Sequence, residues 1–376
     1  MIPFIHERPG WPSLTWDAAS LAHDLAQVRH RQGRVLGRME ALGFEMRDEA
    51  NVLILTKDAV ESSAIEGEHL NEAEVRSSIA RKLGVTLAGL SVPRTQRVDG
   101  IVEVLLDATQ RATQPLTAER LCGWHAALFP TGFSGLRRIT VGAWRTSEAG
   151  PMQVVSGPIG REKLHFEAPD AAILSKEMDD FLSWFDVASR DVTTDDPVLV
   201  AAIAHFWFVT IHPFEDGNGR IARAIADMAL ARGDGLTHRF YSLSSQLMVE
   251  RKDYYRELER AQRGDLDITS WLLWFIGCLD RALSRADELV GGVLRRARSW
   301  KRFEERPGLN ARQRQIIARL LDDFKGHLTT SKYAALTKCS NDTALRDIEG
   351  LVERGILVRN PGGGRSTSYR MVEPEP

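Results

Sequence analysis

The sequence predicts a mainly α-helical protein that carries one small β-hairpin and ends in a separate winged-helix domain. Apolar residues recur at three- and four-residue steps over most of the 376 residues, which is the spacing of helices with one buried face. Residues 130–170 interrupt this spacing with many glycines and prolines, as a hairpin region would. Residues 309–371 then begin a different pattern of three short helices followed by two strands.

The first part of the chain predicts three consecutive helices. Apolar residues from Leu21 to Leu42 form one face of a long amphipathic helix. A second helix is expected at 49–66, because Gly67 is a suitable C-cap residue, and a third opens at Asn71. The same reasoning predicts helices at 95–110, 117–128, 169–185, 196–211, 221–232, 246–263 and 266–290.

The hairpin, the central helix and a linker can also be placed. Residues 152–155 and 163–166 predict two short strands joined by a turn. The helix at 196–211 is apolar on nearly every side, so we expect it at the centre of the fold. The basic stretch 296–308 contains a Pro-Gly pair and is expected to link the last of these helices to the C-terminal domain.

Composition and charge exclude several classes of protein. The formal net charge of −2 gives no overall field that would attract the chain to nucleic acid or membrane. The three cysteines lie far apart without metal-ligand spacing, which disfavours disulfide and zinc sites. The N-terminus has no apolar signal core, and the apolar stretch 271–279 is far too short to span a bilayer. We therefore expect a cytoplasmic protein.

The most informative segment is 212–223, which reads His-Pro-Phe-Glu-Asp-Gly-Asn-Gly-Arg-Ile-Ala-Arg. The buried helix before it must end at Pro213, and another helix follows the loop. Gly217, Asn218 and Gly219 therefore lie at a helix N-terminus, where free N–H groups and the helix dipole favour a phosphate group.

The charged residues of this segment suit phosphoryl chemistry. Arg220 and Arg223 lie three residues apart on the following helix, and both can reach anionic oxygens. Asp216 can hold Mg²⁺, which prefers one or two carboxylates together with substrate phosphates. His212 can take a hydroxyl proton near neutral pH, whereas Phe214 is expected to anchor the loop. A lone histidine or Gly-x-Gly usually indicates only a buried side chain or a turn, but the whole pattern rarely arises by chance.

Residues 212–223 match the signature H-P-F-x-[DE]-G-N-G-R-x-x-R, and the chain therefore resembles Fic domain proteins. The resemblance implies a helical core with the signature between two central helices. It also implies transfer of AMP from ATP to a Ser, Thr or Tyr hydroxyl of a protein, with Mg²⁺ as cofactor and release of pyrophosphate. Gly219 is retained here, whereas the variant of the family that phosphorylates its targets has lysine in place of a motif glycine.

The roles of the family's residues carry over to this chain by position. They imply His212 as the base, Asp216 as the Mg²⁺ ligand, and contacts from Arg220 and Arg223 to the β- and γ-phosphates. The catalytic set is then His212, Asp216, Asn218 and Arg220, and the ATP-binding set is Glu66, Phe214, Gly217, Asn218, Gly219, Arg220, Arg223 and Tyr255.

The segment from Ser62 to Gly67 resembles the inhibitory motif [ST]-x-x-x-E-[GN] of the same family. The resemblance implies that Glu66 pairs with Arg223 in the place of the γ-phosphate and prevents productive binding of ATP, with Ser62 bonded near the motif loop. The alternative is that Glu66 is an exposed carboxylate at a helix end. Glu68 stands where asparagine is common in relatives, a departure without obvious consequence.

Two further regions resemble family elements. Residues 145–168 resemble the flap, a hairpin that would align a target segment by adding a strand to its edge, with Arg145 as an anchor. The alternative is an ordinary structural hairpin. The Tyr254-Tyr255 pair resembles a helix that walls the adenine pocket, so Tyr255 could contact the nucleotide. Gln262 stands where some relatives have asparagine.

Residues 309–371 resemble a winged helix-turn-helix, with 11 Lys and Arg against 6 Asp and Glu between residues 311 and 370. If the domain binds DNA, its third helix would read the major groove through residues such as Thr343 and Arg346, and Arg365 would touch the backbone or the minor groove. Four carboxylates on that helix count against tight DNA binding, namely Asp342, Asp347, Glu349 and Glu353. Contact with DNA and contact with protein remain alternatives.

These features predict a self-inhibited protein adenylyltransferase that depends on Mg²⁺ and ATP. Its target is an unidentified protein, which could be the chain itself, and the amphipathic helices could form a homodimer. The expected domains are an N-terminal helical extension at 1–95, a Fic core at 96–295, a linker at 296–308 and a winged helix at 309–376. The alternative functions are removal of AMP at the same site and a DNA-binding regulator whose Fic core senses nucleotide.

Overall fold

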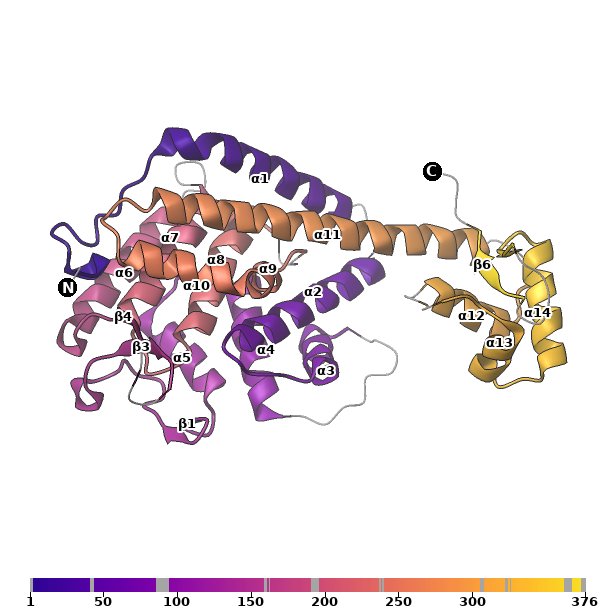
Figure 1. Ribbon diagram of the computed structural model, residues 1–376, viewed down its shortest axis with the longest axis horizontal. Coiled ribbons are helices and arrows are strands. Elements are labelled where there is room, and N and C mark those ends of the chain that lie inside the picture. Colours follow the sequence, from indigo (N-terminus) through magenta and orange to yellow (C-terminus); the bar gives the residue numbers. More distant parts are fainter. Residues whose placement is uncertain are drawn as a thin grey trace. The chain divides into compact units, whose positions relative to one another are not determined.

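The computed structural model confirms a mainly helical fold with small hairpins (Figure 1). Contacts divide the chain into two units, Met1–Glu288 and Leu289–Pro376, and each unit is described by itself. The structure describes residues 3–40, 44–85, 95–158, 161, 163–190, 196–236, 238, 240–304, 308–321, 324, 326–361 and 367–372.

The described residues of the N-terminal unit are mostly helical. The longer helices are α1 (Ala18–Glu40), α2 (Phe44–Ile65), α3 (Glu72–Leu83), α4 (Gln96–Gln110), α5 (Ala118–Leu128), α6 (Leu174–Ala188), α7 (Pro197–Ile211), α8 (Asn218–Asp234), α9 (Leu243–Val249) and α10 (Arg251–Gln262). Helix α11 (Thr269–Glu304) begins in this unit and continues past its last residue, Glu288. The 3-10 helices are η1 (Ile5–Glu7), η2 (Ser147–Ala149) and η3 (Ala171–Ile173). Antiparallel hairpins are formed by β1 (Phe133–Ser134) with β2 (Arg137–Arg138) and by β3 (Gln153–Ser156) with β4 (Lys163–Glu167). The sequence predicted the second hairpin and missed the first, whose strands have only two residues each.

The structure differs from the sequence prediction in two helical regions. The helix predicted at 246–263 is divided into α9 and α10 at Glu250, whose carboxylate binds Arg281 of α11 through both oxygens. Helix α11 continues to Glu304, so the predicted linker at 296–308 is helical over most of its length. The reason is that its arginines, lysine and alanine are good helix formers.

Helices α7 and α8 form the centre of the N-terminal unit and pack against each other. Every residue of α7 except Leu199 is buried, as the sequence predicted for this segment. The helix begins where the Asp196 side chain accepts the N–H of Val198 at 2.8 Å, with Pro197 in the first turn. Helices α2, α4 and α5 contact α8, and α6 contacts α7, so the two central helices are covered on several sides.

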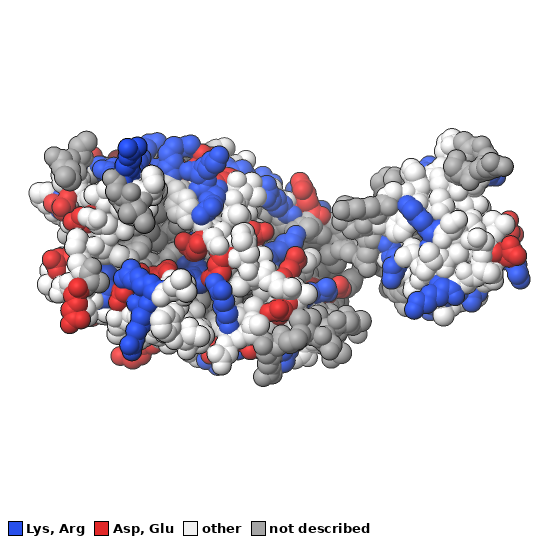
Figure 2. All heavy atoms as spheres, turned by 60° about the horizontal axis from the view of Figure 1, so that its bottom comes forward, with Lys and Arg blue, Asp and Glu red and all other residues white. Residues whose placement is uncertain are grey.

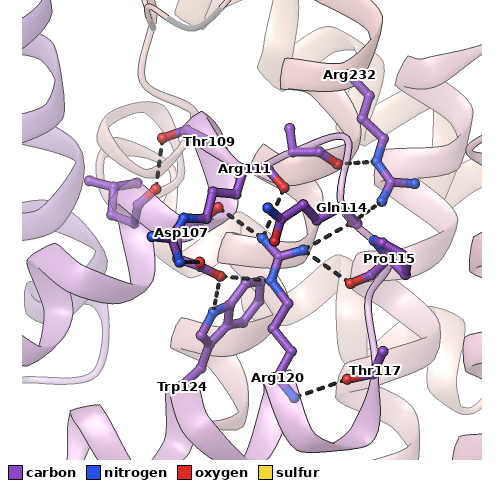
Figure 3. A network of polar contacts seen from close by, with 11 residues as sticks. Asp107, Thr109, Arg111, Gln114, Pro115, Thr117, Arg120, Trp124 and Arg232 are labelled. Atoms are coloured by element: carbon purple, nitrogen blue, oxygen red, sulfur yellow. Dashed lines mark hydrogen bonds and ion pairs between the residues drawn. The ribbon is translucent and has the colours of Figure 1, made fainter.

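A polar network fastens the connection between α4 and α5 to the end of α8 (Figure 3). The Asp107 carboxylate accepts hydrogen bonds from Arg120 Nε and Trp124 Nε1, both at 2.7 Å, and Arg120 also donates to backbone carbonyls of the connection. Arg232, in the last turn of α8, donates to the carbonyls of Ala112 and Gln114. The network fixes α5 against α8 and thereby positions the α5 residues that contact the site.

Helix α1 lies along α11 (Figure 1), where its arginines bind Asp280 and Asp287. Its buried face consists of Leu21, Val28, Gln32, Val35 and Met39. Basic and acidic side chains are interspersed on the face of the N-terminal unit shown in Figure 2, in keeping with the small net charge. Among the described residues, no helix is both long and apolar enough to cross a membrane.

The C-terminal unit has its own apolar core. It contains α12 (Ala311–Leu321), α13 (Thr330–Thr337), α14 (Asn341–Glu353) and a hairpin of β5 (Leu357–Arg359) with β6 (Tyr369–Met371). The core residues include Ile316, Ile317, Leu328, Tyr333, Ala344, Ile348, Leu351, Ile356 and Leu357. This order of helices and strands agrees with the winged-helix pattern predicted for residues 309–371.

Asp347, one of the four carboxylates that we counted against DNA binding, is buried within this unit. Its carboxylate accepts hydrogen bonds from Arg312 Nε at 2.8 Å, Asn310 Nδ2 at 2.7 Å and the Tyr333 hydroxyl at 3.1 Å. Burial raises the pKa of Asp347, but these hydrogen bonds outweigh burial and hold the pKa below its usual range. Asp347 therefore joins α14 to α12 and α13 and does not oppose a ligand at the surface.

The outer face of α14 keeps both kinds of charge. Asp342, Glu349 and Glu353 are exposed, as is Arg346, whereas Thr343 is half-buried and Arg365 lies outside the described residues. Leu345, 40% exposed, adds an apolar side chain to this face. Neither duplex DNA nor a protein surface is favoured by this mixture.

Candidate active site

The turn between α7 and α8 brings the residues of the 212–223 segment together. Helix α7 ends at His212, which adopts a left-handed conformation with φ of 51°, and Gly217 has φ of 78° directly before α8. The Asn218 side chain braces the loop between them, because it accepts the N–H of Phe214 at 3.0 Å and donates to the Phe214 carbonyl at 2.8 Å. Asn218, assigned to catalysis from the sequence, thus serves the shape of the loop with its side chain.

Phe214 is fully buried and packs against aromatic neighbours. Its ring stacks on His125 of α5 at a centroid distance of 4.2 Å and contacts Trp144 at 4.8 Å. This packing agrees with the expected anchoring role. It also means that only the backbone of Phe214 is available to a nucleotide, although the sequence grouped Phe214 with the ATP-binding residues.

His125 of α5 supports the loop, because its ring stacks on that of Phe214. It was not identified from the sequence. Its Nδ1 accepts the N–H of Gly142 at 3.1 Å, and burial lowers its pKa to about 4, so the ring is neutral at physiological pH. The only sequence signal was a histidine on the buried face of a predicted helix, which does not by itself indicate a site.

Arg145 satisfies the carbonyl groups that the end of α7 leaves free. Its guanidinium donates to the carbonyls of His212 at 2.8 Å and Pro169 at 2.5 Å, and its backbone N–H donates to Pro213 at 2.8 Å. Burial lowers the pKa of Arg145, while nearby Asp170 raises it. Arg145 therefore ties the segment before the β3–β4 hairpin to the turn, as an anchor would.

His212 is oriented by the carbonyl of Val209, which lies 3.1 Å from Nδ1. Because a carbonyl oxygen can only accept, Nδ1 carries the proton of the neutral ring and Nε2 has a free lone pair. Burial lowers the pKa of His212 below its ordinary value of 6.5, although the Val209 carbonyl and the carboxylates of Glu66 and Asp216 raise it. The ring is therefore ready to accept a proton through Nε2 at neutral pH.

Asp216 lies at the mouth of the loop beside a hydroxyl group. Its carboxylate accepts hydrogen bonds from the Ser134 hydroxyl and, at 2.5 Å, from the N–H of Gly217. The side chain is 43% exposed. One accessible carboxylate next to a hydroxyl, directly before a helix N-terminus, fits the donor set of Mg²⁺, which takes its remaining ligands from phosphates and water. Ser134 carried no signal in the sequence, because its contact depends on the β1–β2 hairpin.

Arg223 is almost fully buried and holds the segment that ends α2. Its Nε donates to the Ser62 hydroxyl at 2.9 Å, and its Nη2 donates to the Ser62 carbonyl and to Glu66 Oε1, both at 2.8 Å. Burial lowers the pKa of Arg223, but the Glu66 carboxylate outweighs burial and raises it. The structure thus brings Ser62, Glu66 and Arg223 together as the resemblance implied.

Glu66 lies directly on the first turn of α8. A Cβ atom built on Gly219 would collide with Glu66 Oε1, so only glycine at this position leaves room for the carboxylate. Gly67, with φ of 81°, turns the chain immediately afterwards. Glu66 is exposed just beyond the end of α2, as the alternative interpretation held, but its carboxylate is paired with the buried Arg223.

Arg220, the other arginine of the 212–223 segment, is also paired with a carboxylate. Its Nη1 lies 2.6 Å from Glu68 Oε2, while Asp216 is 4.0 Å away, and its guanidinium faces the Phe129 ring at 4.9 Å. Burial lowers the pKa of Arg220, and the charges of Asp216 and Glu66 raise it. Glu68, to which we attached no consequence from the sequence, is thus part of the site.

Tyr255 contacts the end of α2, just before Glu66. Its hydroxyl donates to the Ile65 carbonyl at 3.3 Å, and its ring is 39% exposed. The residue that we expected to contact a nucleotide therefore supports the end of α2 in this conformation. Gln262 is buried and donates to the Thr210 hydroxyl at 3.3 Å, so it belongs to the contact between α10 and α7.

The β3–β4 hairpin offers an exposed edge and is held at its base. Val154 and Val155 are exposed, and the register shifts between them. On β4, His165 bonds to Glu259 of α10 at 2.7 Å, and Phe166 packs on Phe4 at a centroid distance of 5.1 Å. The base of the hairpin is thus fixed by α10 and by the N-terminal segment.

Replacement of Arg145 by lysine tests the role of this residue in the turn. Lysine cannot present the planar fork that reaches two carbonyls, so we expect Arg145→Lys to lower the free energy of unfolding by about 1–3 kcal/mol. Thermal unfolding followed by tryptophan fluorescence measures the effect. The exposed Arg138→Lys is the matched control and should change stability by less than about 0.5 kcal/mol. Equal effects of the two substitutions would contradict this role.

Comparisons with known proteins divide the chain into three matched segments. Residues 4–85 match a domain of unknown function (DUF4172), residues 115–230 match the Fic/DOC family, and residues 312–370 match the DeoR-like helix-turn-helix domain. The chain is 28% identical over 203 residues to the protein adenylyltransferase fic-1 of Caenorhabditis elegans, which covers 54% of this chain and 36% of that protein. It is 34% identical over 112 residues to the protein adenylyltransferase Fic of Nematostella vectensis, which covers 29% of this chain and 23% of that protein.

Solved structures share the fold. A Fic family protein from Desulfovibrio desulfuricans G20 aligns with a TM-score of 0.52 and 20% identity over 94% of this chain and 97% of that one. A Fic domain containing signaling protein from Bacteroides thetaiotaomicron aligns with a TM-score of 0.50 and 18% identity over 72% of this chain and 98% of that one. The chain spans only about a third or less of the length of the two curated relatives named above. The protein thus contains a Fic domain and, C-terminal to it, a DeoR-like helix-turn-helix domain.

Proposed function

We propose that this protein transfers AMP from ATP to a hydroxyl group of a protein and that its own Glu66 holds it in an inactive state. The observation that carries the proposal is the Glu66 carboxylate, which lies against Gly219 in the first turn of α8 and binds Arg223, in the same 212–223 segment in which Val209 orients the His212 ring. The names of the two adenylyltransferase relatives support the same reaction for this chain. The experiments described below test this activity in the whole protein.

The proposed chemistry assigns each residue of the turn one task. His212 Nε2 accepts the proton of the target hydroxyl, whose oxygen attacks the α-phosphorus while the bond to the β-phosphate oxygen breaks and pyrophosphate leaves. The N–H groups at the start of α8 stabilise the charge on the transferred group. Asp216, with the Ser134 hydroxyl beside it, would hold Mg²⁺, whose charge offsets that of the phosphates.

The proposed inhibition follows from competition for one guanidinium group. Arg223 is 2% exposed, and its Nη1 is buried without a hydrogen-bond partner among the described residues. A buried cation of this kind requires an anion, which is either the Glu66 carboxylate or a terminal phosphate of ATP. Because the two anions exclude each other, ATP would bind productively only after Glu66 has moved away.

The proposed acceptor is an extended segment of a protein that includes a Ser, Thr or Tyr hydroxyl. The exposed edge at Val154 and Val155 can pair with such a segment through backbone hydrogen bonds, which accept many sequences. A second copy of the chain is included among these targets. For the helix-turn-helix domain, DNA and protein both remain candidate partners.

Transfer of label from ATP labelled at the α-phosphate tests the reaction, its base and its inhibition together. We expect weak self-labelling of the wild type, labelling at least about 10-fold stronger in Glu66→Gly, and none in Glu66→Gly with His212→Ala. Glu72→Gln, an exposed carboxylate just beyond the inhibitory segment, is the control and should behave as the wild type.

Other outcomes of the same assay would favour the alternatives. Release of AMP from a labelled protein by the wild type, lost in Glu66→Gly, would indicate removal of AMP with Glu66 orienting water. Binding of ATP without label or pyrophosphate in any variant would contradict an enzyme and favour a nucleotide-sensing regulator.

The pH dependence of transfer tests His212 as the base. Burial lowers the pKa of His212 from 6.5, and loss of the Glu66 charge lowers it further, so the neutral ring persists to lower pH. In Glu66→Gly we therefore expect a rate that is constant above pH 6.5 and falls only at more acidic pH. A decline centred above pH 7 would contradict this assignment.

A further inference from the structure

The segment after α2 places two carboxylates, not one, on the arginines of the site. Glu66 contacts Arg223, and two residues later Glu68 contacts Arg220 with an Nη1–Oε2 distance of 2.6 Å. Gly67 separates them with φ of 81°, a backbone conformation that turns the chain so that both neighbours reach α8. The inhibitory segment therefore meets both cations that follow the glycine loop.

The pair of Arg220 and Glu68 is well shielded from solvent. The Arg220 side chain is 8% exposed and that of Glu68 is 12% exposed, in contrast to the many exposed ion pairs elsewhere on the surface. The other oxygen of Glu68 binds Arg97 at the start of α4, so one carboxylate is held from two sides. An ion pair that is shielded and held in this way is harder to displace than a surface pair.

Arg220 also has unused capacity for an anion. Its Nε is buried and makes no hydrogen bond among the described residues, and its flat face is covered by the Phe129 ring at 4.9 Å. A phosphate group arriving at Arg220 would have to replace the Glu68 carboxylate, because two anions cannot share the same shielded place.

We propose that Glu68 is a second inhibitory carboxylate, which excludes from Arg220 the phosphate next to the one transferred, while Glu66 excludes the terminal phosphate from Arg223. The site in this conformation discriminates by the number of phosphates and disfavours nucleoside di- and triphosphates relative to monophosphates. Arg97 is a positioning residue, since it holds Glu68 from outside the site. The assignment of the two phosphates rests on the proposed function, but the exclusion itself is tested by binding alone.

Removal of Glu66 alone would then free Arg223 for a phosphate but leave Arg220 paired with Glu68. Glu68 would still neutralise Arg220 in Glu66→Gly, so the double variant Glu66→Gly with Glu68→Gln should transfer AMP faster than Glu66→Gly. Glutamine keeps the shape of the side chain and its ability to accept a hydrogen bond from Arg220, but it lacks the charge that repels phosphate.

Calorimetric titration with AMP and with ADP, each with Mg²⁺, provides the test. ADP lacks the terminal phosphate, so its affinity relative to AMP reports on Arg220. We expect Glu68→Gln to bind ADP about 10-fold more tightly than its parent, in both the wild-type and the Glu66→Gly backgrounds, with AMP affinity changed by less than about two-fold. Arg97→Ala should shift the ADP affinity in the same direction by a smaller factor, and Glu72→Gln should shift neither affinity.

An unchanged ratio of ADP to AMP affinity in Glu68→Gln and in Arg97→Ala, with normal thermal unfolding of both variants, would overturn the proposal. Weaker ADP binding in Glu68→Gln would overturn it as well, because Glu68 would then help to bind the phosphate. The fate of the transfer reaction is a separate result. If the ADP ratio shifts as expected while no variant transfers AMP, the role of Glu68 stands and the proposed function fails.

Discussion

The abrupt turn between α7 and α8 is the constraint on which the rest of the site depends. An almost completely buried helix ends at His212 in a left-handed conformation, and the chain returns into α8 within a few residues. Such a turn leaves carbonyl groups without helical partners, and Arg145 supplies the missing donors from the hairpin region. Asn218 closes the loop from within. His212, Asp216 and the N-terminus of α8 are therefore placed by the same few contacts.

In the proposed mechanism, the two arginines that follow this turn bind either the protein's own carboxylates or the phosphates of ATP. Shielded guanidinium groups need anions, and Glu66 and Glu68, which follow α2, provide them in this structure. In our account, the residues that hold ATP are the ones that hold the inhibitory segment, so inhibition needs no separate regulatory site. The contact of Tyr255 with the Ile65 carbonyl extends this coupling to α10.

The region that matches a domain of unknown function has three visible structural roles. The segment that follows its helix α2 carries Glu66 and Glu68, its helix α1 lies along α11, and its first residues support the hairpin through the packing of Phe4 on Phe166. These contacts make residues 4–85 an integral part of the N-terminal unit.

Much of the fold and the central motif could be predicted from the sequence, because helical periodicity and the 212–223 segment are local patterns. The pairing of Glu66 with Arg223 was predicted only through the resemblance, since more than 150 residues separate them and no local rule joins them. The contacts of Ser134, His125 and Glu68 were missed for the same reason. Each is an ordinary residue in the sequence and becomes part of the site only when the helices pack.

The position of the terminal phosphate in a complex tests the central claim most directly. A crystal structure of Glu66→Gly with Mg²⁺ and a non-hydrolysable ATP analogue would locate it. Our account places the γ-phosphate on Arg223, where the Glu66 carboxylate lies in the structure described above, with the α-phosphorus facing His212. A bound triphosphate that leaves Arg223 without an anion, or that lies away from the first turn of α8, would contradict the account.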